Sequence, residues 1–179
     1  VPFRNSFADF ASSDFRKPSS VRTIVSADFD NDGYDEIFVN NLGEPNRLFK
    51  VLDDGKLEQI KLSAALEKHG LGTGAAVADI DKDGILELLI SHGELNPQPL
   101  TLYKASLKER RNYIRISPKT KNNSPARGST VILKTNYRQH AKTIDAGSGY
   151  LCQMEPTAHF GLRDKEIVEN VVIRWTDGS

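Results

Sequence analysis

The sequence predicts an all-β protein with two strand-rich repeats followed by a small antiparallel β-sandwich or barrel. Three observations carry this prediction: an acidic motif recurs 51 residues on, short β-type apolar runs flank each copy, and glycine and proline punctuate the C-terminal part. The 179 residues, 38% of them hydrophobic, allow one or two domains with a sizeable core. The longest apolar runs are about five residues, far short of the roughly 20 that span a bilayer, so no membrane span is expected.

The first repeat is expected at about residues 20–55 and the second at about 71–105. Residues 25–39 align with residues 76–90, and a further short apolar run follows each copy. Each unit therefore reads as strand, acidic loop, strand, turn and strand.

The acidic loops read Asp-x-Asp-x-Asp-Gly-x-x-Glu, a spacing that suits a hard cation. Ca²⁺ takes six or more oxygen ligands, which acids at positions 1, 3 and 5 can supply when the backbone curls at the glycine of position 6. The carbonyl of position 7 and the acid of position 9 complete the predicted shell. The predicted metal ligands are Asp28, Asp30, Asp32, the carbonyl of Tyr34 and Glu36 in the first loop, and Asp79, Asp81, Asp83, the carbonyl of Ile85 and Glu87 in the second.

Two other interpretations of these loops compete with calcium. An EF-hand needs an acid at position 12 and flanking helices, but position 12 is Val39 or Ile90 and the flanks are β-type runs. Asp, Asn and Gly can also simply mark turns, although two copies at a fixed period disfavour that interpretation. Mg²⁺ prefers a rigid octahedron that keeps several waters, so four carboxylates per loop favour two Ca²⁺ sites.

The second unit is expected over residues 107–179, after a repeat region at 1–106. Charge changes there: residues 1–105 hold 17 acidic and 11 basic residues, whereas 106–179 hold 7 acidic and 13 basic ones. Strands are predicted at about 112–117, 129–135, 140–145, 157–160 and 169–175, where apolar residues alternate. The zero net charge of the whole chain thus conceals two units of opposite sign.

The cations of the second unit could form one stripe suited to a sulfated glycan, an anionic cell surface or the acidic repeat region itself. The alternative is a solvated strand face that discourages edge pairing. No aromatic side chains interleave with them as in a nucleic-acid groove, so no nucleic-acid partner is expected. The stripe residues are Arg110, Arg111, Arg115, Lys119, Lys121 and Arg127.

No catalytic constellation stands out, and we expect a protein that is not an enzyme. Cys152 with His159 or His140 would suit a thiol nucleophile, but a lone cysteine in an apolar run is more typical of a small buried side chain. Ser148 misses the Gly-x-Ser-x-Gly elbow because residue 146 is alanine. Asn122 begins an Asn-Asn-Ser triplet that matches the N-glycosylation pattern.

At its acidic loops the sequence resembles the FG-GAP or VCBS repeats that form blades of calcium-binding β-propellers. Residues 112–116, 126–129, 147–152, 155–162 and 175–178 resemble the UnbV/ASPIC domain. The resemblance implies two β-propeller-type repeats and a small β domain, with structural Ca²⁺. Two repeats cannot close a propeller ring, which needs at least four blades, so we expect a C-terminal fragment of a longer protein.

The resulting hypothesis is a secreted or cell-surface, calcium-binding interaction or extracellular-matrix protein. Its expected partner is a protein receptor, a matrix component or a sulfated glycan. The alternative is a carbohydrate-binding or enzyme-accessory module, and a hydrolase is third. The metal supports an extracellular location, because a loop with a Kd of about 10⁻⁴ M would fill at millimolar Ca²⁺ and stay empty in the cytosol.

Overall fold

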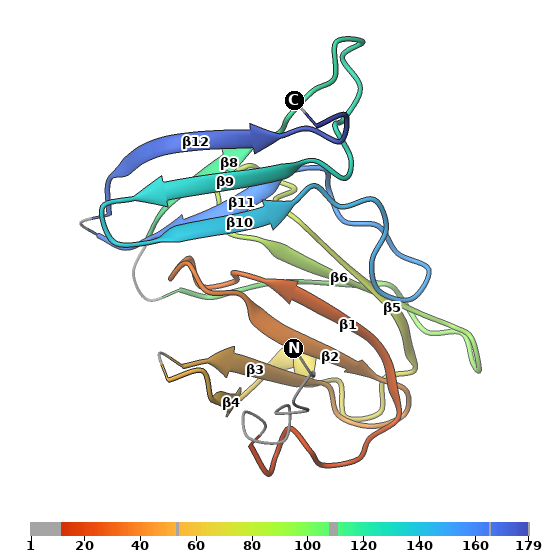
Figure 1. Ribbon diagram of the computed structural model, residues 1–179. Helices are drawn as coiled ribbons and strands as arrows, with labels where there is room; N and C mark the ends of the chain where they lie inside the picture. Colours follow the sequence, from red (N-terminus) through yellow and green to blue (C-terminus); the bar gives the residue numbers. More distant parts are fainter. Residues whose placement is uncertain (1–11, 53, 108–110, 165, 179) are drawn as a thin grey trace, which may run out of the picture.

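A computed structural model describes residues 12–52, 54–107, 111–164 and 166–178, and the predicted all-β fold is confirmed (Figure 1). A single 3₁₀ turn, η1 (Ala64–Leu66), interrupts the strands that the structure describes. The strands are β1 (Val21–Ala27), β2 (Glu36–Asn41), β3 (Arg47–Val51), β4 (Leu57–Ile60), β5 (Gly72–Ala78), β6 (Glu87–His92), β7 (Thr101–Lys104), β8 (Asn112–Ile116), β9 (Thr130–Thr135), β10 (Gln139–Thr143), β11 (Ala158–Leu162) and β12 (Val168–Arg174).

The two repeats form two antiparallel sheets of the same design. One has the strand order β1-β2-β3-β4 and the other β5-β6-β7, and in each an acidic loop joins the first strand to the second. The two sheets also share an irregularity in strand pairing. The register shifts between Val21 and Thr23 in β1, and between Gly72 and Gly74 at the corresponding place in β5. The sequence did not predict β4, a short edge strand with no fully buried residue.

The two repeat sheets share one apolar core. β1 and β2 lie against β5, and the inward side chains of the first sheet, such as Val25 and Phe38, join those of the second, such as Val77 and Leu88. Phe38 and Ile90 are completely buried. Each sheet therefore buries one apolar face against the other, as expected for repeat units that pack against their neighbours.

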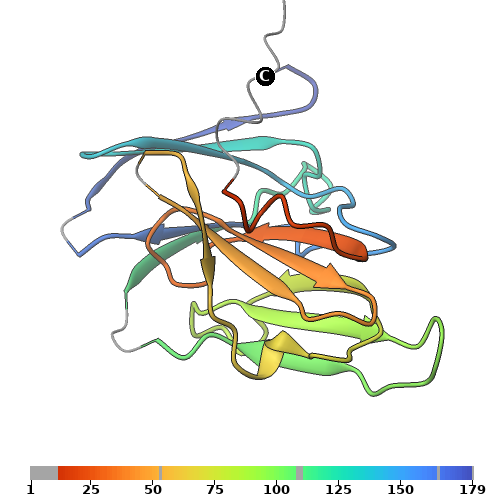
Figure 2. The same ribbon diagram turned by 90° about the horizontal axis from the view of Figure 1, so that it is seen from below.

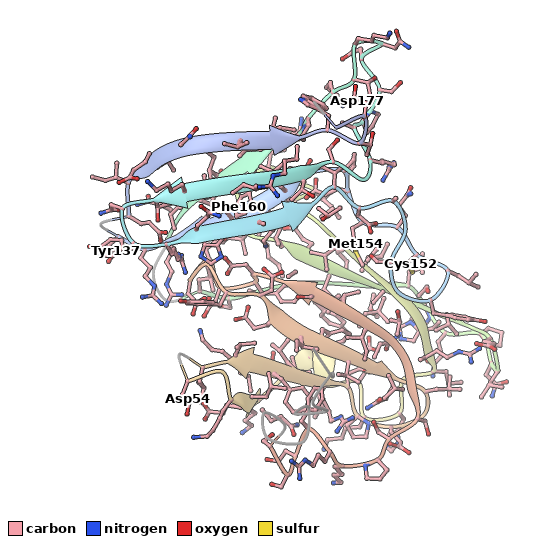
Figure 3. The ribbon with its side chains drawn as sticks, viewed as in Figure 1. Asp54, Tyr137, Cys152, Met154, Phe160 and Asp177 are labelled. Carbon is pink, nitrogen blue, oxygen red and sulfur yellow. The ribbon has the colours of Figure 1, made fainter. Side chains whose placement is uncertain are left out.

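The five strands predicted for the second unit are all present, with ends shifted by no more than two residues. They form a three-stranded sheet, β10-β9-β12, and a two-stranded sheet, β11-β8. Val131, Leu133 and Phe160 belong to one buried core cluster to which both sheets contribute, and Figure 3 labels Phe160 within this unit. Of the two predicted forms, this is the sandwich, because the described strands lie in two separate sheets.

The sandwich lies over the end of the repeat sheets that carries the acidic loops, as Figures 1 and 2 show. The predicted boundary after residue 106 stays a prediction, since residues 108–110 lie outside the described ranges. Within those ranges, no helix has the length and apolar character needed to cross a bilayer.

Candidate metal centres

Both acidic loops curl through the same pair of backbone conformations. Loop position 4 has a positive φ, 57° at Asn31 and 61° at Lys82, and so does position 6, 87° at Gly33 and 83° at Gly84. Glycine adopts this left-handed region freely, and asparagine tolerates it better than most residues. The glycine predicted to permit the sharp turn therefore does so in both copies.

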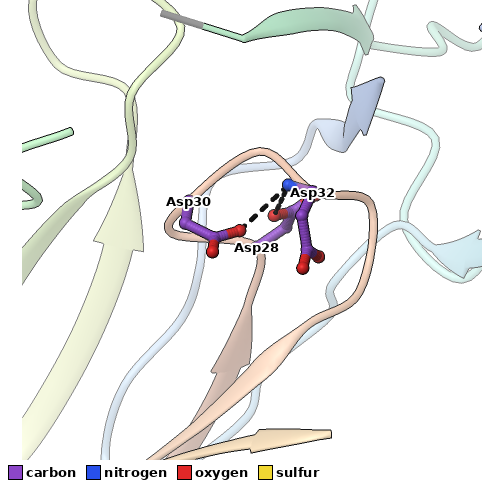
Figure 4. Close-up of side chains that lie close together, drawn as sticks. All are labelled: Asp28, Asp30 and Asp32. Atoms are coloured by element: carbon purple, nitrogen blue, oxygen red, sulfur yellow. Dashed lines mark hydrogen bonds between the residues drawn. The ribbon is translucent and has the colours of Figure 1, made fainter. Parts of the chain in front are cut away.

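The first loop turns three carboxylates toward one another. Asp28, Asp30 and Asp32 each offer an oxygen atom within 4.8 Å of the others. The backbone N–H of Asp32 donates to the carboxylates of Asp28 and Asp30 at 3.0 Å each (Figure 4), and the N–H of Gly33 donates to Asp28 at 2.8 Å. The curl of the backbone thus fixes the side chains of positions 1, 3 and 5 around a common point.

The second loop repeats this arrangement with one change of membership. Its 4.8 Å group consists of Asp79, Asp81 and Glu87. The N–H of Gly84 donates to Asp79 at 3.1 Å, as Gly33 does to Asp28. Asp83 accepts a 2.9 Å hydrogen bond from the N–H of Ile85.

The last acid of each loop begins the following strand and accepts a hydrogen bond from the start of the loop. Glu36 accepts a 3.0 Å hydrogen bond from the N–H of Phe29, and Glu87 accepts one of 2.7 Å from the N–H of Ile80. Tyr34 donates its own N–H to Asp32 at 2.9 Å. The ligand roles assigned to the carbonyl oxygens of Tyr34 and Ile85 stay predictions.

The electrostatics of both loops fit a bound cation. Glu36 is 1% exposed and Asp79 is 6% exposed, and one carboxylate oxygen of each, Oε1 and Oδ1 respectively, has no hydrogen-bond partner among the described residues. Burial, reinforced by neighbouring acids, raises the pKa of Asp28 to about 6 and that of Glu36 to about 8. Because every ligand offered is an oxygen, the loops suit a hard divalent ion, which would satisfy these buried atoms.

Two cations of the predicted stripe lie against the acidic loops. Arg111 is 3.0 Å from the carboxylate of Asp30, and Arg115 is 2.8 Å from Asp79 and also pairs with Glu155. Arg111 and Arg115 therefore contact one of the three partners expected for the stripe, namely the acidic repeat region itself.

The other stripe residues are placed differently. Lys119 and Lys121 are exposed. Arg127 is half-buried and donates to the carbonyl of Asp145, whereas Arg110 lies outside the described residues. The side chains of the stripe therefore do not share one environment.

Asn31 joins the two loops to the sandwich, a role that its place in the acidic motif does not predict. Its side-chain amide donates to the carbonyl of Gly84 at 2.8 Å, and its Oδ1 lies 2.6 Å from Nε2 of His159. The N–H of Gly161 on the same strand donates to Asp28 at 3.0 Å. The only hint of this role in the sequence is the asparagine at loop position 4. Its partners lie 53 and 128 residues away, so the motif does not identify them.

His159, Ser148 and Cys152 were weighed above as catalytic candidates, and all three lie near the junction of the two units. Burial, with Lys142 and Arg115 nearby, lowers the pKa of His159 to about 4, and its ring stacks on Tyr113. A cavity of about 350 Å³ at the junction is lined in part by His159 and Ser148. Cys152 is half-buried in the connection from β10 to β11, against Gly74 (Figure 3).

Two known protein families match different parts of the chain. Residues 28–90 match the FG-GAP-like repeat family and residues 119–179 match the ASPIC and UnbV family. Over 96% of its length, the chain is 45% identical to cartilage acidic protein 1 of Homo sapiens, 44% to that of Mus musculus and 43% to that of Xenopus tropicalis. It spans only 27% to 28% of the length of these relatives.

Proposed function

Because the chain belongs to the proteins that join FG-GAP-like repeats to an ASPIC and UnbV segment, we propose that it is a calcium-binding interaction protein of the extracellular-matrix type. Two Ca²⁺ ions bind in the acidic loops and stabilise the junction between the repeats and the sandwich. The name of the relatives, which places them in cartilage, supports an extracellular location.

One observation carries the calcium proposal: each loop buries a carboxylate oxygen that has no hydrogen-bond partner among the described residues. A buried carboxylate oxygen without a partner is costly, and in the first loop burial raises the pKa of Glu36 to about 8. The loop backbone already directs the neighbouring carboxylates to the same point. Calcium would supply the missing charge without a change of fold, so metal binding and folding are linked.

The position of the loops gives the ions a structural role. Asp28 and Asp79 are the first ligands of the two loops, and both also accept hydrogen bonds from the sandwich, from Gly161 and Arg115. An ion that fixes these acids also fixes the surface on which the sandwich rests. With a Kd of about 10⁻⁴ M and about 1 mM Ca²⁺, each site would add roughly 1.4 kcal/mol of stability.

Thermal unfolding in a calcium titration tests this proposal. Two filled sites should raise the melting temperature by roughly 6 to 11 °C for a chain of this size. Asp30→Asn and Asp81→Asn should each remove about half of that gain. Asp54→Asn is the matched control, because Asp54 (Figure 3) lies in the exposed turn before β4 and pairs there with Lys56. No gain at millimolar Ca²⁺ would refute the calcium proposal.

The partner surface is the finer part of the proposal. We infer that a sulfated-glycan contact would use Lys119 and Lys121, which are exposed beside Asn122 of the predicted glycosylation triplet. Arg111 and Arg115 are instead committed to the acidic loops. Retention on heparin above physiological salt, lost in a Lys119→Gln/Lys121→Gln variant, would support a glycan partner, and elution at physiological salt would favour a protein partner.

A further inference from the structure

Each repeat directs one lysine into its acidic loop from the third strand. Lys104 is paired with Glu87 across β6 and β7. In the first repeat, Ile37 is paired with Phe49, so that Lys50 lies opposite Glu36. The two lysines are therefore structural equivalents, each opposite the last acid of its loop.

The equivalence is hidden in the sequence. The acidic motifs are 51 residues apart, whereas the lysines are 54 residues apart. Three extra residues lie in the connection from β6 (Glu87–His92) to β7 (Thr101–Lys104), compared with that from β2 (Glu36–Asn41) to β3 (Arg47–Val51). The longer connection offsets the difference in spacing, so that each lysine lies opposite the last acid of its own loop.

The ammonium groups occupy the part of each loop that the metal ligands surround. Nζ of Lys104 is 2.7 Å from oxygens of Asp81, Asp83 and Glu87, and it donates hydrogen bonds to both oxygens of Asp81. Nζ of Lys50 is 2.9 Å from Asp30 and also pairs with Asp32. These five acids are all predicted calcium ligands, and the same oxygen atoms cannot enclose an ammonium group and a metal ion together.

The fit of the lysines is incomplete. Each ammonium group brings one positive charge to two or three carboxylates. Oε1 of Glu36, Oδ1 of Asp79 and Oε1 of Glu87 still have no hydrogen-bond partner among the described residues. The lysine side chains are 27% and 29% exposed, so each can turn outward on its flexible stem. A Ca²⁺ ion carries twice the charge and takes six or more oxygens, so it can reach the buried atoms as well.

We propose that Lys50 and Lys104 are tethered counter-cations, which hold the acidic loops in shape without metal and which Ca²⁺ displaces when it binds. This inference rests on the proposed calcium function and adds what sets the affinity. Displacement of the ammonium group opposes binding, so each lysine weakens its own site. Each lysine also stabilises the metal-free chain, because its positive charge reduces the repulsion among the converging carboxylates.

The test compares Lys50→Met and Lys104→Met with the unaltered chain by calorimetric calcium titration and by thermal unfolding in EDTA. Each variant should bind Ca²⁺ about tenfold more tightly at its own site and should melt at a lower temperature in EDTA. In saturating Ca²⁺ its melting temperature should equal that of the unaltered chain, because the lysine is then displaced. Lys104→Arg keeps the charge and should keep the weaker affinity.

Lys56→Met is the matched control, since Lys56 pairs with Asp54 in an exposed turn and should leave calcium affinity unchanged. Equal or weaker calcium binding by both loop variants would overturn the inference. So would a Lys104→Met chain that is unstable with and without Ca²⁺, because the ion should replace the ammonium group. If no chain, altered or not, bound Ca²⁺, the proposed function itself would fail, which is a different result from equal binding by all.

Discussion

Replacement of Gly161 by alanine should separate the sandwich from the first acidic loop. Gly161 lies in β11, and its N–H donates to Asp28 at 3.0 Å. A Cβ atom at this position would lie 2.3 Å from Oδ2 of Asp28, and 2.4 Å and 2.5 Å from the backbone C and Cα of Asn31. The constraint is one of space, since the backbone conformation at Gly161 lies outside the left-handed region.

The cost follows from what cannot move. Asn31 is held by His159 on one side and by the carbonyl of Gly84 on the other, so its backbone cannot shift without loss of these bonds. Overpacking costs about 1 to 3 kcal/mol, and a hydrogen bond to a charged carboxylate contributes about 1.5 to 3 kcal/mol. We expect Gly161→Ala to lower the free energy of unfolding by about 3 to 5 kcal/mol, a large share of the 5 to 15 kcal/mol typical of folded proteins.

Urea denaturation in EDTA and in millimolar Ca²⁺ measures this loss as a shift of the midpoint at constant slope. Gly147→Ala is the comparison, because a Cβ atom there meets nothing within 4 Å and only its φ of 140° adds strain. A Gly161→Ala loss below about 1 kcal/mol, or one no larger than that of Gly147→Ala, would refute the close packing of the loop against β11.

Three further predictions concern charges at the junction. Arg115→Met should destabilise the chain by about 3 to 5 kcal/mol, because it leaves the buried Asp79 without its ion pair. Urea denaturation should show a smaller loss of stability in Ca²⁺ than in EDTA. The exposed control, Lys134→Met, should lose under about 1 kcal/mol of stability. Since the pKa of Glu36 is raised to about 8 and that of Asp28 to about 6, calcium binding at pH 7 should release about one proton at the first loop, and its affinity should fall from pH 8 to pH 6. Calorimetry in buffers of different ionisation enthalpy counts that proton, and a count of zero would contradict the raised pKa of Glu36. Burial alone would raise the pKa of Glu166, but hydrogen bonds from Arg138, Thr135 and the N–H of Arg163 lower it to about 2. Its stabilising effect, on the order of 3 kcal/mol, should therefore be complete above about pH 5 and lost toward pH 2, and Glu166→Gln should flatten this part of the urea-measured stability profile.

The class of fold and the two candidate metal loops are predictable from local patterns along the chain. Strand alternation is a local pattern, so the five strands of the second unit were predicted with small errors at their ends. The acidic spacing and Gly33 and Gly84 are also local, because a loop curls through its own backbone dihedral angles. The bulge-like shift at the same place in β1 and β5 continues that repetition in the structure.

The surroundings of the loops depend on contacts between segments that are far apart in the chain. Asp28 meets Gly161 and Asp79 meets Arg115 across 133 and 36 residues, and no local pattern encodes such a contact. The equivalence of Lys50 and Lys104 depends on strand register, which the unequal connections obscure in the sequence. Side-chain charges show that cations are present, but distance and burial decide whether they face solvent or a carboxylate. For this reason the cationic stripe predicted as one surface includes two arginines that contact the acidic loops.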